Sequence, residues 1–254
     1  MSSIDYKLDP NEDDWRLERT ARLADVWNNP WTGQVIPKGA RVTVIAPNMQ
    51  IGKNKTISIP LPNATALLLN SAAHAFESAS KIRLGSGFDK SLHKEVSFST
   101  DEEAFNYLER MIESIILAFT ALEAFINESI PENFTYAKFN KRKKLEETLL
   151  KEDIERNINI DEKLSSVLPE CLICASPKGK RQWEEYQKLK VTRDRIVHMK
   201  TKDRSVRVDD VDPLWRSLFI TPAPHITVKT MIDHFAKHME NKPLWYDKFP
   251  YKRM

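Results

Sequence analysis

The sequence predicts a mainly helical protein, and three observations support this fold class. From Asn63 onward, apolar residues recur mostly at the spacing of a helix. Six glycines against fourteen prolines are atypical of a turn-rich all-β fold. The one convincing β pattern is confined to residues 41–61. We therefore expect a small N-terminal appendage at residues 1–61, followed by a helical bundle at residues 62–254.

The appendage is predicted to contain one helix and one β-hairpin. Asp9–Pro10 and the acidic residues after it suit a helix start, which gives a helix over residues 10–27 that ends before Pro30. Residues 41–46 are rich in β-branched side chains and residues 56–60 alternate. Both are predicted to be short strands, joined by a turn that contains Gly52.

The bundle is predicted to contain five helical segments. They cover residues 63–84, 101–130, 145–174 (one or two helices, broken at Pro169), 181–200 and 228–240. Ser99 and Thr100 can cap the second of these helices, and Pro131 ends it. The second half of that helix is apolar almost all round, which predicts a position in the middle of the bundle.

Two polar features interrupt these apolar faces. Thr120, Glu123 and Asn127 form one line on the central helix. On the helix over residues 181–200, Arg193 shares an apolar stripe with Tyr186, Leu189, Ile196 and Val197. A guanidinium group on a core-facing line needs acceptors, and Glu123 is the natural partner. A polar lock between the two helices would explain both features, and if it is buried, Glu123→Ala should cost about 3–5 kcal/mol.

The same helix carries an acid and a histidine after Arg193. Asp194 and His198 are four residues apart, so the carboxylate can hold and orient the imidazole. Arg193 and His198 are five residues apart, which is about 140° around a regular helix. On one straight helix, the two side chains would therefore point in different directions. A bend, or two copies of the helix across a dimer axis, would bring them together.

The segment Thr192–His198 (TRDRIVH) resembles the R-x4-6-H motif of HEPN domains, in which a polar residue typically follows the arginine. The segment Ala118–Asn127 (AFTALEAFIN) is similar to the long internal helix of that family, with its embedded Glu and Asn. The resemblance covers about residues 62–240 and implies a HEPN-like helical bundle. Residues 1–61 match no family that we can name.

The resemblance also implies a function. HEPN proteins usually dimerise, and many are metal-independent endoribonucleases of toxin–antitoxin and antiphage systems. His198 would transfer a proton at the ribose 2′-hydroxyl or the leaving oxygen, Arg193 would bind the scissile phosphate, and Asp194 would orient the pair. Glu123 and Asn127 would support this catalytic group. One branch of the family is modified by a nucleotidyltransferase on a tyrosine two residues after the histidine. Here Lys200 stands at that position, which speaks against such regulation.

The expected partners are RNA, a second copy of the chain, and an antitoxin or defence-system protein. A formal net charge of +3 permits an anionic partner without requiring one. Candidate RNA-binding residues are Arg195, Lys200 and the basic run Lys141, Arg142, Lys143 and Lys144. Basic runs are also common on solvated faces, so the run alone does not establish an RNA path.

The cytoplasm is the expected location. The start of the chain lacks the apolar core of a signal peptide, and the most apolar stretch, residues 111–126, is too short for an ordinary membrane span. Cys171 and Cys174 have metal-ligand spacing, but no second cysteine pair exists. His234 and His238 lack the glutamate of the zinc-protease motif. We therefore expect no metal and no cofactor.

Two alternatives to the ribonuclease stay open. The first is a non-catalytic HEPN module that binds RNA or a partner protein. The second is a helical scaffold in which the Arg–Asp–His cluster only pins helices together. The enzyme needs Arg193 and His198 near a groove that solvent can reach, whereas the scaffold needs both residues buried and mutually satisfied.

Overall fold

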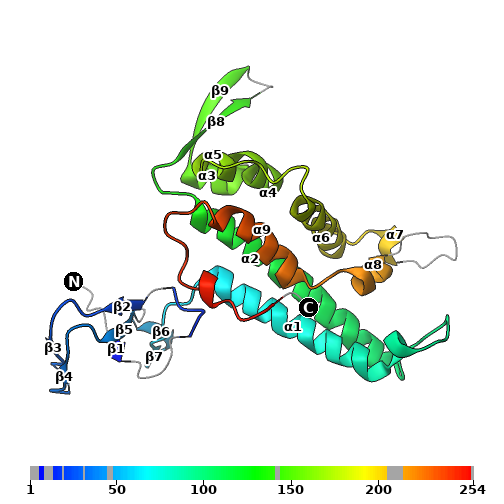
Figure 1. Cartoon of the computed structure of the whole chain (residues 1–254), viewed down its shortest axis with the longest axis horizontal. Coiled ribbons are helices and arrows are strands. Elements are labelled where there is room, and N and C mark those ends of the chain that lie inside the picture. Colours follow the sequence, from blue (N-terminus) through cyan, green and yellow to red (C-terminus); the bar gives the residue numbers. More distant parts are fainter. Residues whose placement is uncertain are drawn as a thin grey trace. The chain divides into compact units, whose positions relative to one another are not determined.

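The computed structural model describes residues 6–8, 14–18, 20–30, 32–44, 48–140, 144–204 and 214–252. These residues are mainly helical, with several small strand pairs, which confirms the predicted fold class (Figure 1). The chain divides into two compact units. The first contains Met1–Leu67 and Lys242–Pro250, and the second contains Leu68–Asn241 and Tyr251–Met254.

The first unit is built from short antiparallel strands. β5 (Arg41–Val44) lies between β1 (Tyr6–Leu8) and β2 (Thr20–Arg22), β3 (Trp27–Asn28) pairs with β4 (Val35–Ile36), and β6 (Met49–Gly52) pairs with β7 (Lys55–Ile57). Val42 and Ile36 are buried. The C-terminal part of this unit contains the short helix η3 (Tyr246–Lys248), and Phe249 beside it packs edge-on against Trp15, with ring centroids 5.7 Å apart.

The predicted helix over residues 10–27 is wrong for the part that is described. That part contains β2 and the first residue of β3. β2 pairs with β5, about twenty residues further along the chain, and such long-range pairing can outweigh local helix-start signals. The predicted hairpin also differs from the structure. β5 pairs with β1 and β2, whereas β7 pairs with β6, which lies in the predicted turn.

The second unit contains the helical bundle. Its long helices are α1 (Ala64–Ser86), α2 (Asp101–Ser129), α6 (Arg181–Val197) and α9 (Pro224–Ala236). α2 contacts α6 and α9, which also contact each other, and the Ser114 hydroxyl of α2 donates to the Ala72 carbonyl of α1 at 2.8 Å. These four helices confirm the predictions for residues 63–84, 101–130, 181–200 and 228–240, with shifted ends.

The start of α2 shows why these long helices were predictable. The Thr100 hydroxyl accepts a hydrogen bond from the Glu103 N–H at 3.2 Å, and the Glu103 carboxylate accepts one from the Ser99 N–H at 3.2 Å. This reciprocal capping fixes the first turn. Further along, α2 buries Met111, Ile115, Phe119, Leu122 and Ile126, as its apolar second half predicts.

The segment between α2 and α6 differs from its prediction. It contains the hairpin β8 (Thr135–Asn140) and β9 (Leu145–Leu150), then α3 (Lys151–Asn157), α4 (Ile160–Glu162), the π-helical turn η2 (Lys163–Val167) and α5 (Leu168–Cys171). The predicted helix over residues 145–174 therefore begins as a strand and breaks at residues 158–159. It does not break at Pro169, which lies directly after the π-helical turn in an uninterrupted helical run over residues 160–171.

Three short helices complete the second unit. They are η1 (Phe88–Lys90), α7 (Thr201–Arg204) and α8 (Leu214–Ile220). α8 contacts both α2 and α6. In the described ranges, every helix is too short or too polar to cross a membrane.

Candidate functional site at the end of helix α6

The motif of Arg193, Asp194 and His198 lies at the C-terminal end of α6. The helix ends at Val197, and His198 is its C-cap residue, with φ −114° and ψ 42°. The His198 N–H still donates to the Asp194 carbonyl at 2.9 Å, so the backbone leaves the helix at the histidine itself. His198 therefore no longer has a helical backbone conformation, and no hydrogen bond or ion pair among the described residues joins its side chain to Arg193.

Arg193 is held against α2 by an aromatic ring and one carboxylate, and it also pairs with a carboxylate of its own helix. Its guanidinium carbon lies 4.6 Å from the centre of the buried Phe119 ring. Its Nη2 lies 3.6 Å from a carboxylate oxygen of Glu123, which is an ion pair but too long for a hydrogen bond. Its Nη1 donates to Asp194 at 3.0 Å. The predicted pairing of Arg193 with Glu123 is therefore confirmed as an ion pair.

Glu123 and Asn127 extend this contact along α2. Burial raises the pKa of Glu123, and the negative charge of Asp194 adds to the increase, whereas Arg193 and Lys163 oppose it. The Lys163 ammonium group, on the π-helical turn η2, donates to Asn127 Oδ1 at 3.0 Å and to the Glu155 carbonyl at 2.8 Å. The polar line on α2 thus joins two partners, Arg193 on α6 and Lys163 on η2.

The third polar residue on that line behaves differently. Thr120 is exposed, and its hydroxyl donates to the Ile116 carbonyl of its own helix at 2.9 Å. The apolar stripe on α6 is also shorter than predicted. Tyr186 and Leu189 are buried, but Ile196 is half-buried and Val197 is exposed. Val197 is the last residue of α6.

His198 and Asp194 do not form the contact that their spacing suggests. The Asp194 carboxylate faces Arg193, and the His198 side chain is exposed. Within the described ranges, the His198 imidazole has no hydrogen-bond partner. The site therefore contains an Arg193 guanidinium group that is held in place and a His198 imidazole without a hydrogen bond to the described residues. Both lie at the C-terminal end of α6.

The candidate RNA-binding residues are not equivalent. Both Nε and Nη2 of Arg195 donate to the Asp203 carboxylate, at 2.9 and 2.8 Å, so this guanidinium group binds within the protein. Lys200 is exposed, and its backbone N–H donates to Asp203 at 3.2 Å. Lys144 is exposed in the turn between β8 and β9. Lys141, Arg142 and Lys143 lie outside the described residues.

Sequence reasoning missed an acidic residue that binds three side chains of α6. Asp161 accepts hydrogen bonds from the Tyr186 hydroxyl at 2.5 Å, from Gln187 at 3.1 Å and from the Lys190 ammonium group at 2.5 Å. Burial would raise the pKa of Asp161, but these three hydrogen bonds outweigh burial and lower it. The spacing of Tyr186, Gln187 and Lys190 marks one face of α6, yet nothing in the sequence identifies their common partner.

We expect Glu123→Ala to lower the free energy of unfolding by about 1 kcal/mol or less, as for other partly exposed ion pairs. The reason is that the Glu123 side chain is 40% exposed, while Arg193 keeps its contact with Asp194 after the substitution. Urea denaturation of the parent and of Glu123→Ala measures this difference. A loss near the 3–5 kcal/mol expected for a buried lock would contradict the exposure of this pair.

Within the described ranges, no group of three or more His, Cys, Asp or Glu side chains is placed to hold a metal ion. Cys171 and Cys174 are both free thiols that are partly exposed, and burial raises the pKa of each. Comparison with protein-family models, with curated proteins and with solved structures gives no match for this chain.

Proposed function

We propose that this protein is an endoribonuclease of the HEPN type that cuts RNA without a metal ion, through the ribose 2′-hydroxyl. One observation carries the proposal. Arg193 is fixed against α2, while five residues away the exposed His198 imidazole has no partner among the described residues. An arginine that can bind phosphate and a histidine that can move a proton are the groups this reaction needs.

In the proposed reaction, His198 takes the proton from the 2′-hydroxyl as this oxygen attacks the adjacent phosphorus. The bond from O2′ to phosphorus forms, the bond from phosphorus to O5′ breaks, and the leaving O5′ takes a proton from water. The protonated His198 then returns its proton to the solvent. The products are a 2′,3′-cyclic phosphate and a 5′-hydroxyl. Arg193 would stabilise charge on the phosphate by exchanging its contact with the part-exposed Asp194 for one with a phosphate oxygen.

The proposal includes a homodimer in which two copies of α6 lie close together. Val191 and Val197 of α6 are 56% and 48% exposed, so both are accessible to a partner copy. A two-fold interface would place a second Arg193 and His198 near the first pair. Sedimentation velocity at micromolar concentration should show a dimer, and a persistent monomer would contradict this part of the proposal.

The activity can be tested with purified protein and a mixture of cellular RNAs in EDTA. We expect cleavage to continue in EDTA, and a matched all-DNA substrate to stay intact because it lacks the 2′-hydroxyl. The products should end in a 2′,3′-cyclic phosphate, which mass spectrometry identifies. Loss of cleavage in EDTA with recovery on adding Mg²⁺, or cleavage of the DNA, would overturn the proposed mechanism.

A second candidate function is a HEPN module that binds RNA or a partner protein without cutting. The observation that favours it is the pairing of Arg193 with both Glu123 and Asp194, which leaves its charge compensated inside the protein. Under this alternative, folded and dimeric protein would leave RNA intact. Retention of labelled RNA in a gel-shift assay would then distinguish an RNA-binding module from a protein-binding one.

A further inference from the structure

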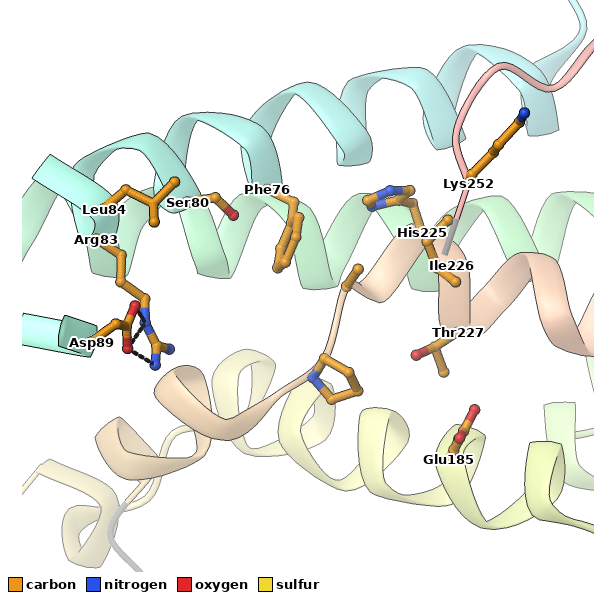
Figure 2. A pocket seen from close by; sticks show the side chains of 12 residues that line it. Phe76, Ser80, Arg83, Leu84, Asp89, Glu185, His225, Ile226, Thr227 and Lys252 are labelled. Atoms are coloured by element: carbon orange, nitrogen blue, oxygen red, sulfur yellow. Dashed lines mark hydrogen bonds and ion pairs between the residues drawn. The ribbon is translucent and has the colours of Figure 1, made fainter. Parts of the chain in front are cut away.

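A cavity lies away from the end of α6, between α1, α9 and the C-terminal segment of the second unit. Its volume is about 410 Å³, which is within the range of small-molecule sites. Figure 2 shows Phe76 and Leu84 from α1 on one side, and His225 and Ile226 from α9 on another. These side chains make the wall largely apolar, so the cavity suits a ligand with an apolar body.

His225 is the unusual group in this wall. Its side chain is 95% buried, since only 5% of it is exposed, and its Nδ1 has no hydrogen-bond partner. Burial lowers the pKa of His225 to about 4, so the ring is neutral near pH 7 and carries one N–H. Phe76 and Tyr251 flank the ring, with centroids 5.6 and 5.4 Å away. A buried polar atom without a partner is costly, and a bound water, ion or ligand can supply the missing hydrogen bond.

The N-terminus of α9 adds donors at the same place. Ala223 is the N-cap residue and has no side chain that can cap the helix, and Pro224 has no N–H. The backbone N–H of His225 is therefore the first donor of α9, and nothing in the described ranges accepts from it. The positive end of the helix dipole and this N–H favour an anion.

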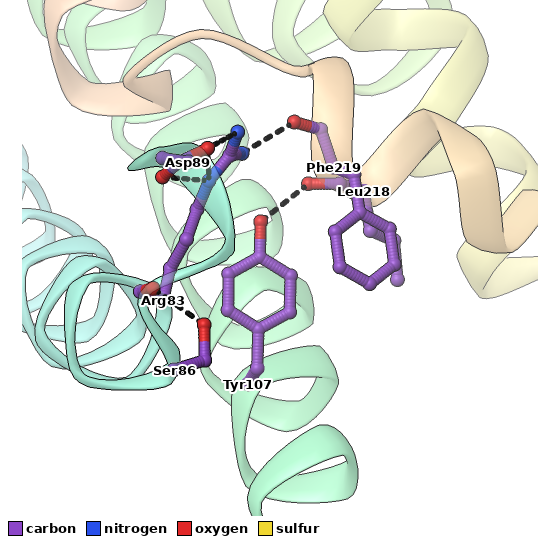
Figure 3. A network of polar contacts seen from close by, with 6 residues as sticks. All are labelled: Arg83, Ser86, Asp89, Tyr107, Leu218 and Phe219. Carbon is purple, nitrogen blue, oxygen red and sulfur yellow. Dashed lines mark hydrogen bonds and ion pairs between the residues drawn. The ribbon is translucent and has the colours of Figure 1, made fainter. Parts of the chain in front are cut away.

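All but one of the charged side chains in the wall have an oppositely charged partner. Arg83 donates to Asp89 through Nε at 2.7 Å and Nη2 at 2.6 Å, and to the Phe219 carbonyl at 3.0 Å. Figure 3 shows this network, together with Tyr107, whose hydroxyl donates to the Leu218 carbonyl at 3.3 Å. Glu185 accepts from Arg181 at 2.7 Å. Lys252 is exposed and has no ion-pair partner among the described residues, so the wall has one uncompensated positive charge.

We propose that this cavity binds a small monocarboxylic acid with an apolar body. The carboxylate accepts hydrogen bonds from His225 Nδ1–H and from the backbone N–H of His225. Lys252 lines the same cavity, and its flexible side chain would have to turn toward His225 to meet this charge, while the apolar body lies against Phe76 and Ile226. The proposal does not depend on RNA cleavage at α6. The apolar body is either a ring or an alkyl chain, and the ligands of the test distinguish the two.

The test is isothermal titration of the full-length protein with phenylacetate, hexanoate and acetate, and with the neutral isostere phenylacetamide. We expect saturable binding of phenylacetate or hexanoate, and the stronger of the two identifies the ring or the chain. Phenylacetamide and acetate should each bind at least about tenfold more weakly, because one lacks the charge and the other the apolar body. Equal binding of phenylacetate and phenylacetamide, or no binding of either acid at millimolar concentration, would overturn the proposal.

Substitutions in the wall test whether the acid binds in this cavity. His225→Phe keeps a ring but removes the nitrogens, so the acid should bind about tenfold more weakly while the melting temperature does not fall. Lys252→Ala should weaken binding several-fold, and Lys81→Ala, an exposed lysine of α1 outside the wall, should leave it unchanged. If His225→Phe fails to fold, Ser80→Phe places a ring in the cavity from α1 and should block the acid. Parental affinity in the folded His225→Phe or Ser80→Phe variant would refute the assignment.

Discussion

His198→Ala should reduce the rate of RNA cleavage by a factor of about 10²–10⁴, the usual cost of removing one positioned acid–base group. The fold should survive, because the His198 side chain is exposed and bonds to no described residue. We expect the free energy of unfolding to stay within about 0.5 kcal/mol of the parent value. Single-turnover cleavage of a labelled RNA, with urea denaturation of the same samples, measures both quantities.

A matched control separates this effect from the loss of any imidazole. His93 is an exposed histidine between η1 and α2, and His93→Ala should keep the parental cleavage rate. Expression in a bacterial host gives a second readout. If the parent is toxic, His198→Ala should relieve the toxicity and His93→Ala should not. A His198→Ala protein that cleaves RNA at the parental rate would remove His198 from the mechanism.

Phe119→Ala is expected to have the largest effect on stability, a loss of about 3–5 kcal/mol in the free energy of unfolding. Phe119 is 1% exposed, and its ring stacks on Tyr186 of α6 with centroids 6.2 Å apart. The same ring lies under the Arg193 guanidinium group. Truncation leaves a cavity between α2 and α6 and removes the surface on which Arg193 rests. Urea denaturation measures the loss.

Phe119→Leu is the matched control for volume. It keeps most of the buried apolar surface, so its cost should stay below about 1.5 kcal/mol. Circular dichroism should show the parental helix content for this variant. If Phe119→Ala cost less than Phe119→Leu, the ring would not lie in the interface between α2 and α6.

The long helices could be predicted because their signals are local. Thr100 caps α2, Pro131 follows its end, and the apolar positions between them recur at helical spacing. In the first unit, β5 and β7 were predicted from their own residues, but β2, β6 and the strand pairing were not, because β2 is defined by its pairing with β5 about twenty residues away. β8 and β9 were missed for the same reason, since a strand is stabilised by its neighbour more than by its own residues.

The candidate site shows the same division between local and long-range information. Arg193 on an apolar stripe predicts an acidic partner, and Glu123 is that partner. The contact expected between Asp194 and His198 assumed a continuous helix, and it is absent because α6 ends one residue before the histidine. Asp161 could not be identified as a partner of α6. It lies 25 residues before Tyr186, and no sequence pattern links the two segments.

The hydrogen bonds to Asp161 also fix the rotation of α6 about its own axis. Tyr186, Gln187 and Lys190 hold one face of α6 to Asp161, and Arg193 follows Lys190 after less than one turn. Inserting one residue between Lys190 and Arg193 would turn the guanidinium group by about 100° away from Phe119, while Lys190 kept its place. A one-residue insertion there is therefore expected to separate Arg193 from Phe119 and Glu123 while the contacts of Asp161 persist.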